Sequence, residues 1–199
     1  YIDRIWFGEG FHYDDVPLDY WLVEISGLPF GVMGEMLQHG GNLWLGQLFG
    51  MTNRLGWGGD PRPIWEFRDQ FGFAGCQFTG FWDPASPVRS DAAQVPATVY
   101  RMPKHTVIAL GNFSREARKA TLTIDWQALG FDPTRAKLYA PPIHGFQPEM
   151  VFAPDTAIPV SPKRGWLLVL DETPRTVRKI DPEELLIGRR TLLEERFEG

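Results

Sequence analysis

Hydrophobic and polar positions follow two different patterns along this chain, and the change between them falls near residue 75. Before that point, strand-like apolar runs alternate with segments of helical periodicity. The run IDRIWFG (residues 2–8) predicts a buried strand. The following PLDYWLVEIS (17–26) predicts a helix, with Pro17 in its first turn and Gly27 at its end.

A second strand and helix repeat this order. The apolar, glycine-spaced segment LPFGVMGEML (28–37) predicts a strand that ends at an acid, Glu35. In residues 40–59 apolar positions recur at helical spacing, and the final glycine pair is expected to stop the helix. Strand, helix, strand, helix is the order of βα units, and two such units make a quarter of an eight-fold barrel. A further helix is predicted over PRPIWEFRDQFG (61–72).

From Cys76 onward the pattern becomes short β-rich runs separated by turns. The predicted strands are CQFTGFW, ATVYRM, HTVIALGNF, KATLTIDW, AKLYAP, IPV and GWLLVLD. Spacing of this kind predicts an antiparallel β-sandwich, with Trp126 and Trp166 at least partly buried. The fold class is therefore α/β plus all-β. Residues 1–75 are expected to be the C-terminal strands and helices of a (β/α)8 TIM barrel, residues 76–175 the sandwich, and residues 176–199 an amphipathic helix.

Composition narrows the possible functions. At 199 residues and 43% hydrophobic, the chain has enough apolar side chains for a packed core. A net charge of -5 argues against nucleic acid as a partner, since nucleic-acid binders carry a clustered basic face. The lone Cys76 excludes an internal disulfide framework, and no apolar run is long enough for a membrane span. We expect no cofactor and no metal, and the sequence leaves the cellular compartment open.

Two acids stand where a barrel enzyme carries its chemistry. Glu9, between two glycines, and Glu35 each follow a predicted strand, and the ends of parallel barrel strands meet at one mouth. Glycoside hydrolysis needs two carboxyl groups, and neighbouring strand ends would hold them about 5 to 10 Å apart. We therefore take Glu9 and Glu35 as candidate catalytic residues. The alternative is that either acid pairs with an arginine or caps a helix.

Candidate substrate-binding residues surround these acids in the sequence. The stretch GFHYDD offers hydrogen-bonding groups and an aromatic face suited to a sugar, although for Asp14 and Asp15 a solvated turn that starts the following helix is the favoured interpretation. Asn53 and Arg54 are expected to hydrogen-bond a substrate or to cap a helix. Trp57, in a glycine-rich loop, is expected to stack on a sugar ring, whereas Trp44 and Trp65 are expected to pack. The full set is Trp6, His12, Tyr13, Asp14, Asn53, Arg54 and Trp57.

Four longer motifs carry a family resemblance: DRIWFGEGFHYD, DYWLVEISGLPFGVMGEML, GMTNRLGWGGDPRPIW and DWQALG. Together they resemble the C-terminal part of a bacterial family of glycoside-hydrolase-like proteins whose function is largely unassigned. The resemblance extends to about residue 171. It implies a catalytic (β/α)8 barrel followed by an antiparallel sandwich, similar in layout to α-galactosidase-type enzymes. It also implies that the earlier strands of the barrel lie upstream in the same polypeptide.

Two functional hypotheses remain open. In the first, the chain is a glycoside hydrolase, or the C-terminal part of one, acting on a poly- or oligosaccharide. In the second, it is a non-catalytic carbohydrate-binding or structural module in which the acids are structural. A third, partner binding through the C-terminal helix, rests on that helix alone.

Overall fold

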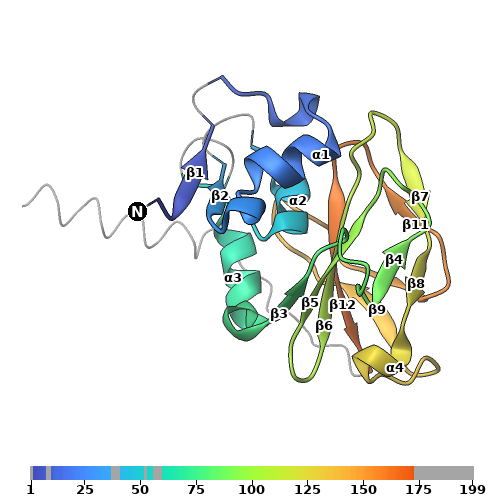
Figure 1. Cartoon of the computed structure of the whole chain (residues 1–199). Coiled ribbons are helices and arrows are strands. Elements are labelled where there is room, and N and C mark those ends of the chain that lie inside the picture. The colour runs from blue at the N-terminus through green and yellow to red at the C-terminus, as the bar shows by residue number, and fades with distance from the viewer. Residues whose placement is uncertain (1, 8–9, 37–40, 52, 56–59, 173–199) are drawn as a thin grey trace, which may run out of the picture.

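The computed structural model describes residues 2–7, 10–36, 41–51, 53–55 and 60–172. In Figure 1 a short pair of strands, β1 and β2, lies on one side of a group of helices, and antiparallel strands occupy the other side. None of the helices in these ranges has the length and apolar character needed to cross a bilayer.

Strands β1 (Arg4–Trp6) and β2 (Met33–Glu35) pair in parallel, with Trp6 opposite Glu35. A third extended segment continues this arrangement, because Met36 forms a parallel bridge with Asn53. The predicted parallel pairing is therefore confirmed, but the second strand is shorter than predicted because Leu28–Phe30 forms a 3₁₀ turn between two left-handed glycines. The described residues contribute three neighbouring parallel segments, which is an arc of a sheet and not a closed barrel.

The helical predictions hold with one correction. Helix α1 (Leu18–Tyr20) runs on into a π-helical turn at Trp21–Ile25, and Gly27 follows in the left-handed conformation. Helix α3 spans Arg62–Gln70. Helix α2 (Leu43–Gly46) continues as a 3₁₀ turn at Gln47–Phe49 and ends at Gly50, whose φ is 74°. The glycine pair predicted to stop it lies eight residues further on, because Gly50 already supplies the left-handed turn.

Antiparallel strands make up the rest of the described chain. The main sheet has the order β10-β9-β12-β6-β5-β3, and two smaller pairs are β11-β7 and β4-β8. The bounds of these strands are β3 Gln77–Thr79, β4 Val88–Ser90, β5 Ala97–Arg101, β6 Thr106–Gly111, β7 Arg118–Ala120, β8 Leu122–Ile124, β9 Lys137–Ala140, β10 Met150–Phe152, β11 Ile158–Val160 and β12 Gly165–Asp171. The layered antiparallel arrangement expected after Cys76 is thus present.

Three details of this region differ from the sequence prediction. The predicted strand KATLTIDW breaks at Thr121 into β7 and β8, which pair with different partners, and ends in a helical turn, α4 (Trp126–Leu129). Strands β4 and β10 were not predicted, since neither stands out as an apolar run. Trp126 and Trp166 are both partly buried, as expected. The predicted C-terminal helix, 176–199, lies outside the described residues.

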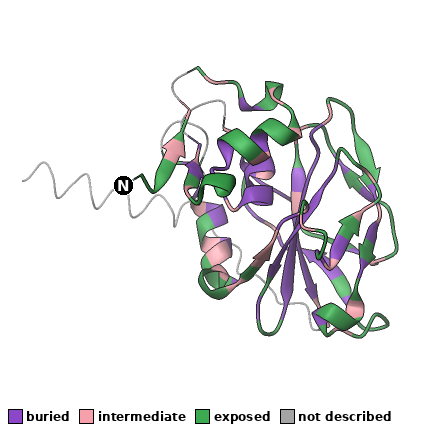
Figure 2. Cartoon of the chain, in the orientation of Figure 1, coloured by how far each residue is buried: buried purple, intermediate pink, exposed green. Residues whose placement is uncertain are grey.

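The main sheet is buried on both faces. Alternate residues of its central strands point to opposite sides. Ile108 and Leu168 pack with the two smaller strand pairs, whereas Val107, Leu167 and Tyr100 pack with the helices of the first 75 residues. Figure 2 shows the resulting continuous buried centre. One apolar core therefore crosses the predicted domain boundary at residue 75.

Candidate active site

The alternation of side chains along β1 and β2 divides them between two faces. Ile5 and Gly34 stand opposite each other on the face toward the helices, where the Gly34 amide donates to the Ser26 carbonyl at 2.7 Å. The opposite face of this strand pair carries Arg4, Trp6, Met33 and Glu35. Glu35, the last residue of β2, is thus directed away from the helices.

Glu35 is held by a two-pronged ion pair. The Arg54 guanidinium approaches it with Nε 3.0 Å from Oε1, and Nη2 donates to Oε2 at 3.0 Å. The hydrogen bond to Glu35 and the nearby negative charge raise the pKa of Arg54. Arg54 follows the third parallel segment, so three neighbouring segments meet at this carboxylate. One hydrogen bond and one close charge contact therefore fix the Glu35 carboxylate against the Arg54 guanidinium.

Two further side chains share this face. A guanidinium nitrogen of Arg4 lies 3.9 Å from Oε1 of Glu35, and the Trp6 side chain is opposite Glu35 in the strand register. Trp6 is 54% exposed, which is high for a tryptophan on a strand. An open indole beside a fixed carboxylate and two cations is a combination able to bind the apolar and the hydroxyl faces of a sugar.

Two predicted binding residues have packing roles instead. Tyr13 is fully buried, with its ring packed edge-on against Phe11 and near Trp21. Asn53 is 2% exposed and lies close against Gly41. Neither side chain is open to a substrate in this structure. Tyr13 is buried because it packs against Trp21, whose indole N–H also donates to the Tyr13 carbonyl, and the sequence of the loop alone does not reveal this contact.

The other polar residues of the predicted loop lie at the surface. His12 is exposed and precedes a 3₁₀ turn at Tyr13–Asp15. Asp14 is exposed and accepts a 2.7 Å hydrogen bond from the side chain of Asn42, the N-cap of α2. Asp14 therefore joins two helical segments, and the hydrogen bond that it accepts comes from Asn42 and not from a residue around Glu35.

Glu9 and Trp57 lie outside the described residues, so their predicted roles stay predictions. Among the described residues no group of three or more His, Cys, Asp or Glu side chains could hold a metal ion. The sequence allowed an acid to pair with an arginine, but it identified neither Arg54 as the partner of Glu35 nor Arg4 as its neighbour. Arg4 precedes Trp6 by two residues, and side chains two apart on a strand point to the same face. This spacing was the one sign in the sequence that Arg4 lies on the face of Trp6 and Glu35.

Comparison with known families covers both parts of the chain. The family model for the glycoside hydrolase 123 TIM-barrel domain matches residues 1–56, and that for the glycoside hydrolase 123 C-terminal domain matches residues 60–171. No curated protein matches the chain. The border between the two matches falls just before α3, about fifteen residues earlier than the border predicted from the change of pattern.

Proposed function

The chain belongs to glycoside hydrolase family 123, and from this premise we propose that it forms the C-terminal part of a glycoside hydrolase acting on a poly- or oligosaccharide. Residues 1–56 would supply the last strands of a (β/α)8 barrel. The parallel register of β1, β2 and the segment at Asn53 supports this, since parallel strands in sequence order are the unit of such a barrel.

The open edge of β1 supports a barrel completed by other strands. Within the described residues β1 pairs with β2 alone. The face opposite the helices leaves Trp6 and Met33 more than half exposed, and Ile2 nearby is 77% exposed. Further strands of the same polypeptide, placed beside β1, would pair its free edge and enclose this face as a barrel interior.

The observation that carries the proposed activity is the position of Glu35. It is the last residue of a parallel strand, faces away from the covering helices and is fixed by Arg54. In barrel enzymes the catalytic groups stand at this end of the strands. A carboxylate paired with an arginine in this way suits the nucleophile or base of a glycosidase and not its proton donor.

The second carboxyl group of the proposed pair is Glu9. It follows the end of β1 by three residues in the sequence, and β1 is the immediate neighbour of β2. Sequence order would therefore bring the two acids to the same end of adjacent strands. We assign the proton donor to Glu9 and substrate binding to Trp6, Arg54 and Trp57, with His12 and Asp14 on the flanking loop.

A second candidate is a structural role, in which this chain supports a catalytic centre located elsewhere in the protein. The hydrogen bond and ion pair between Arg54 and Glu35 favour it, because such a pair also serves to lock adjacent strands together. Under this hypothesis, loss of Glu35 would weaken folding and leave the chemistry intact.

Kinetics of the intact protein separate the two candidates. We expect Glu35→Gln and Glu9→Gln each to lower kcat about 100-fold or more on an aryl glycoside that the parent protein cleaves. Glu24→Gln is the control, because Glu24 is an exposed acid on the helical side of β2. Unchanged kcat in both active-site variants, with a lower melting temperature for Glu35→Gln, would establish the structural role.

A further inference from the structure

A hollow lies beside the first residue of β2, Met33, at the opposite end of this strand from Glu35. Its volume is about 470 Å³, and it extends from the chain before β2 to the main sheet. Leu28, Gly31 and Val32 line it on one side, and Phe78 of β3 and Tyr100 of β5 line it on the other. It is therefore formed jointly by the two parts of the chain, and it is separate from the proposed active site.

One cation, Arg68 of α3, forms part of the wall. Its guanidinium is largely buried and donates to the carbonyls of Gly50 and Met51, at 3.1 and 3.0 Å, and to Oε1 of Gln47 at 2.7 Å. All three acceptors are neutral. The Nε–H group is buried and has no acceptor among the described residues.

The positive charge of Arg68 has no carboxylate partner in the described ranges, where every ion pair involves other residues. Burial lowers the pKa of its guanidinium, which is the expected effect of removing a cation from water. Native structures rarely leave a buried charge without an opposite charge, because desolvation costs several kcal/mol. An anion in the hollow would supply the missing partner.

The rest of the wall is apolar. Phe49, Phe73 and Phe78 surround the space, and the Arg68 guanidinium lies 5.7 Å from the centre of the Phe73 ring. The Tyr100 hydroxyl is already committed to the Gln47 carbonyl. A strongly hydrated inorganic ion would gain nothing from these rings, whereas a ligand with an apolar body would bury it against them.

We propose that this hollow is a binding site for a small monocarboxylate with an apolar body, its carboxylate directed to Arg68 and its body against the phenylalanines. The geometry follows the usual pattern of a ligand site, in which apolar walls surround one charged group that fixes orientation. The assignment is independent of the proposed glycosidase activity, since it uses none of the residues around Glu35.

Cys76 makes occupancy measurable. It is the only cysteine of the chain, is partly exposed and lines the same hollow. The neutral reagent N-ethylmaleimide will therefore report access to the hollow, with mass spectrometry measuring the rate of modification. With a Kd of about 1 mM, benzoate at about 10 mM should slow this reaction about ten-fold. Benzamide, which has the same shape without the charge, should slow it little.

Variants test the role of charge. Arg68→Met should abolish protection by benzoate, whereas Arg68→Lys should retain part of it. Because Arg68 also supports a loop, a second pair of variants leaves Arg68 in place. Leu28→Glu adds a carboxylate at the exposed rim of the hollow and should abolish protection by benzoate. Leu28→Gln has a similar size without the charge and should preserve this protection. Equal protection by benzoate and benzamide, or no protection by either, would overturn the proposal.

Discussion

Arg164 stacks on the indole ring of Trp44, with 3.8 Å between the guanidinium carbon and the ring centre. The other partner of Trp44 is Phe146, whose ring lies parallel to the indole at 5.2 Å and whose carbonyl accepts the indole N–H at 2.9 Å. Trp44 belongs to α2, whereas Arg164 and Phe146 come from loops of the antiparallel region. The indole thus joins the two parts of the chain that match different family models.

We expect Arg164→Ala to lower the free energy of unfolding by about 0.5 to 1 kcal/mol, the range measured for cation–π pairs at exposed sites. Arg164→Lys should retain part of this because the charge remains over the ring. Urea denaturation followed by tryptophan fluorescence measures both variants. If both variants unfold at the parent urea concentration, the stacking contributes nothing to the contact between the two parts.

Gly34 allows the strand β2 to lie directly on the chain after α1. A Cβ atom built on Gly34 would fall 2.0 Å from the Ile25 carbonyl oxygen and 2.7 Å from that of Ser26. Both obstacles are backbone atoms that cannot rotate away. Gly34→Ala should therefore destabilise the protein by about 3 kcal/mol or more, at the upper end of overpacking substitutions. Gly75→Ala, at a site with no atom within 4 Å of the added carbon, is the control. Equal stability of the two variants would show that β2 can move off this contact.

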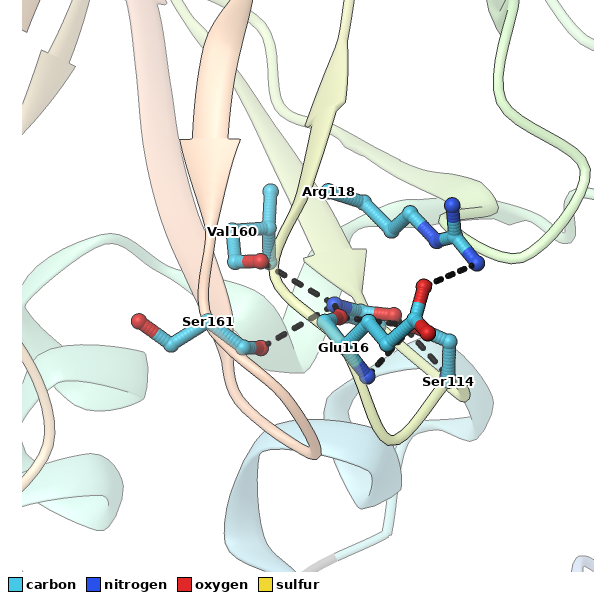
Figure 3. A network of polar contacts seen from close by, with 6 residues as sticks. Ser114, Glu116, Arg118, Val160 and Ser161 are labelled. Carbon is cyan, nitrogen blue, oxygen red and sulfur yellow. Dashed lines mark hydrogen bonds and ion pairs between the residues drawn. The ribbon is translucent and has the colours of Figure 1, made fainter.

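The side chain of Asn112 joins three backbone segments near the end of β6. Its amide nitrogen lies within hydrogen-bond distance of the carbonyls of Glu116, Val160 and Ser161, at 2.8, 3.0 and 3.2 Å. Its oxygen accepts from the Ser114 amide at 2.9 Å. Figure 3 shows Val160 and Ser161 approaching the turn that contains Ser114 and Glu116, with Arg118 paired to Glu116 nearby.

Asn112→Asp should be more damaging than Asn112→Ala. The alanine variant leaves the carbonyls without their donor, at a cost of about 1 to 3 kcal/mol, whereas aspartate also places a negative charge against three carbonyl oxygens. Urea denaturation at neutral pH compares the two, and Ser114→Ala tests the turn alone. If the aspartate variant proves as stable as the parent, the side chain does not bind these carbonyls in solution.

Alkaline pH should destabilise the protein through Tyr100. This residue is buried, and burial raises its pKa from its ordinary value of 10 to about 12. Because the folded pKa exceeds the unfolded one, the stabilising effect is complete below pH 10. It is lost as the pH rises through 12, since the unfolded chain ionises first. The free energy of unfolding should fall across this window by about 2 to 3 kcal/mol.

Tyr100→Phe separates this contribution from that of other groups. Its unfolding free energy should vary less between pH 9 and pH 11.5 than that of the parent. Tyr139, whose pKa is likewise raised to about 12 by burial and by its hydrogen bond to Glu149, is less deeply placed, and Tyr139→Phe is the comparison. An identical pH profile for Tyr100→Phe and the parent would mean that Tyr100 is accessible to hydroxide in the folded state.

Local pattern determined much of this fold. Apolar period and glycine position located β1, β2 and the main antiparallel strands, because both signals act within a few residues. The same signals located α3 and the helical segment before Gly27. The end of α2 was misjudged, since Gly50 and the later glycine pair give the same local signal and only packing distinguishes them.

Only the tertiary structure decided which residues distant in sequence contact each other. The sequence placed an acid, Glu35, at the end of β2. Whether this acid pairs with an arginine depended on the position of Arg54, which lies nineteen residues later in the sequence. The burial of Tyr13 and Asn53 likewise depends on segments remote in sequence. That Arg68 meets only neutral acceptors within the described ranges depends on the packing of α3 against the turn at Gly50. Side-chain type and spacing specify local conformation, whereas the electrostatic partner of a charged group is set by how the whole chain closes on itself.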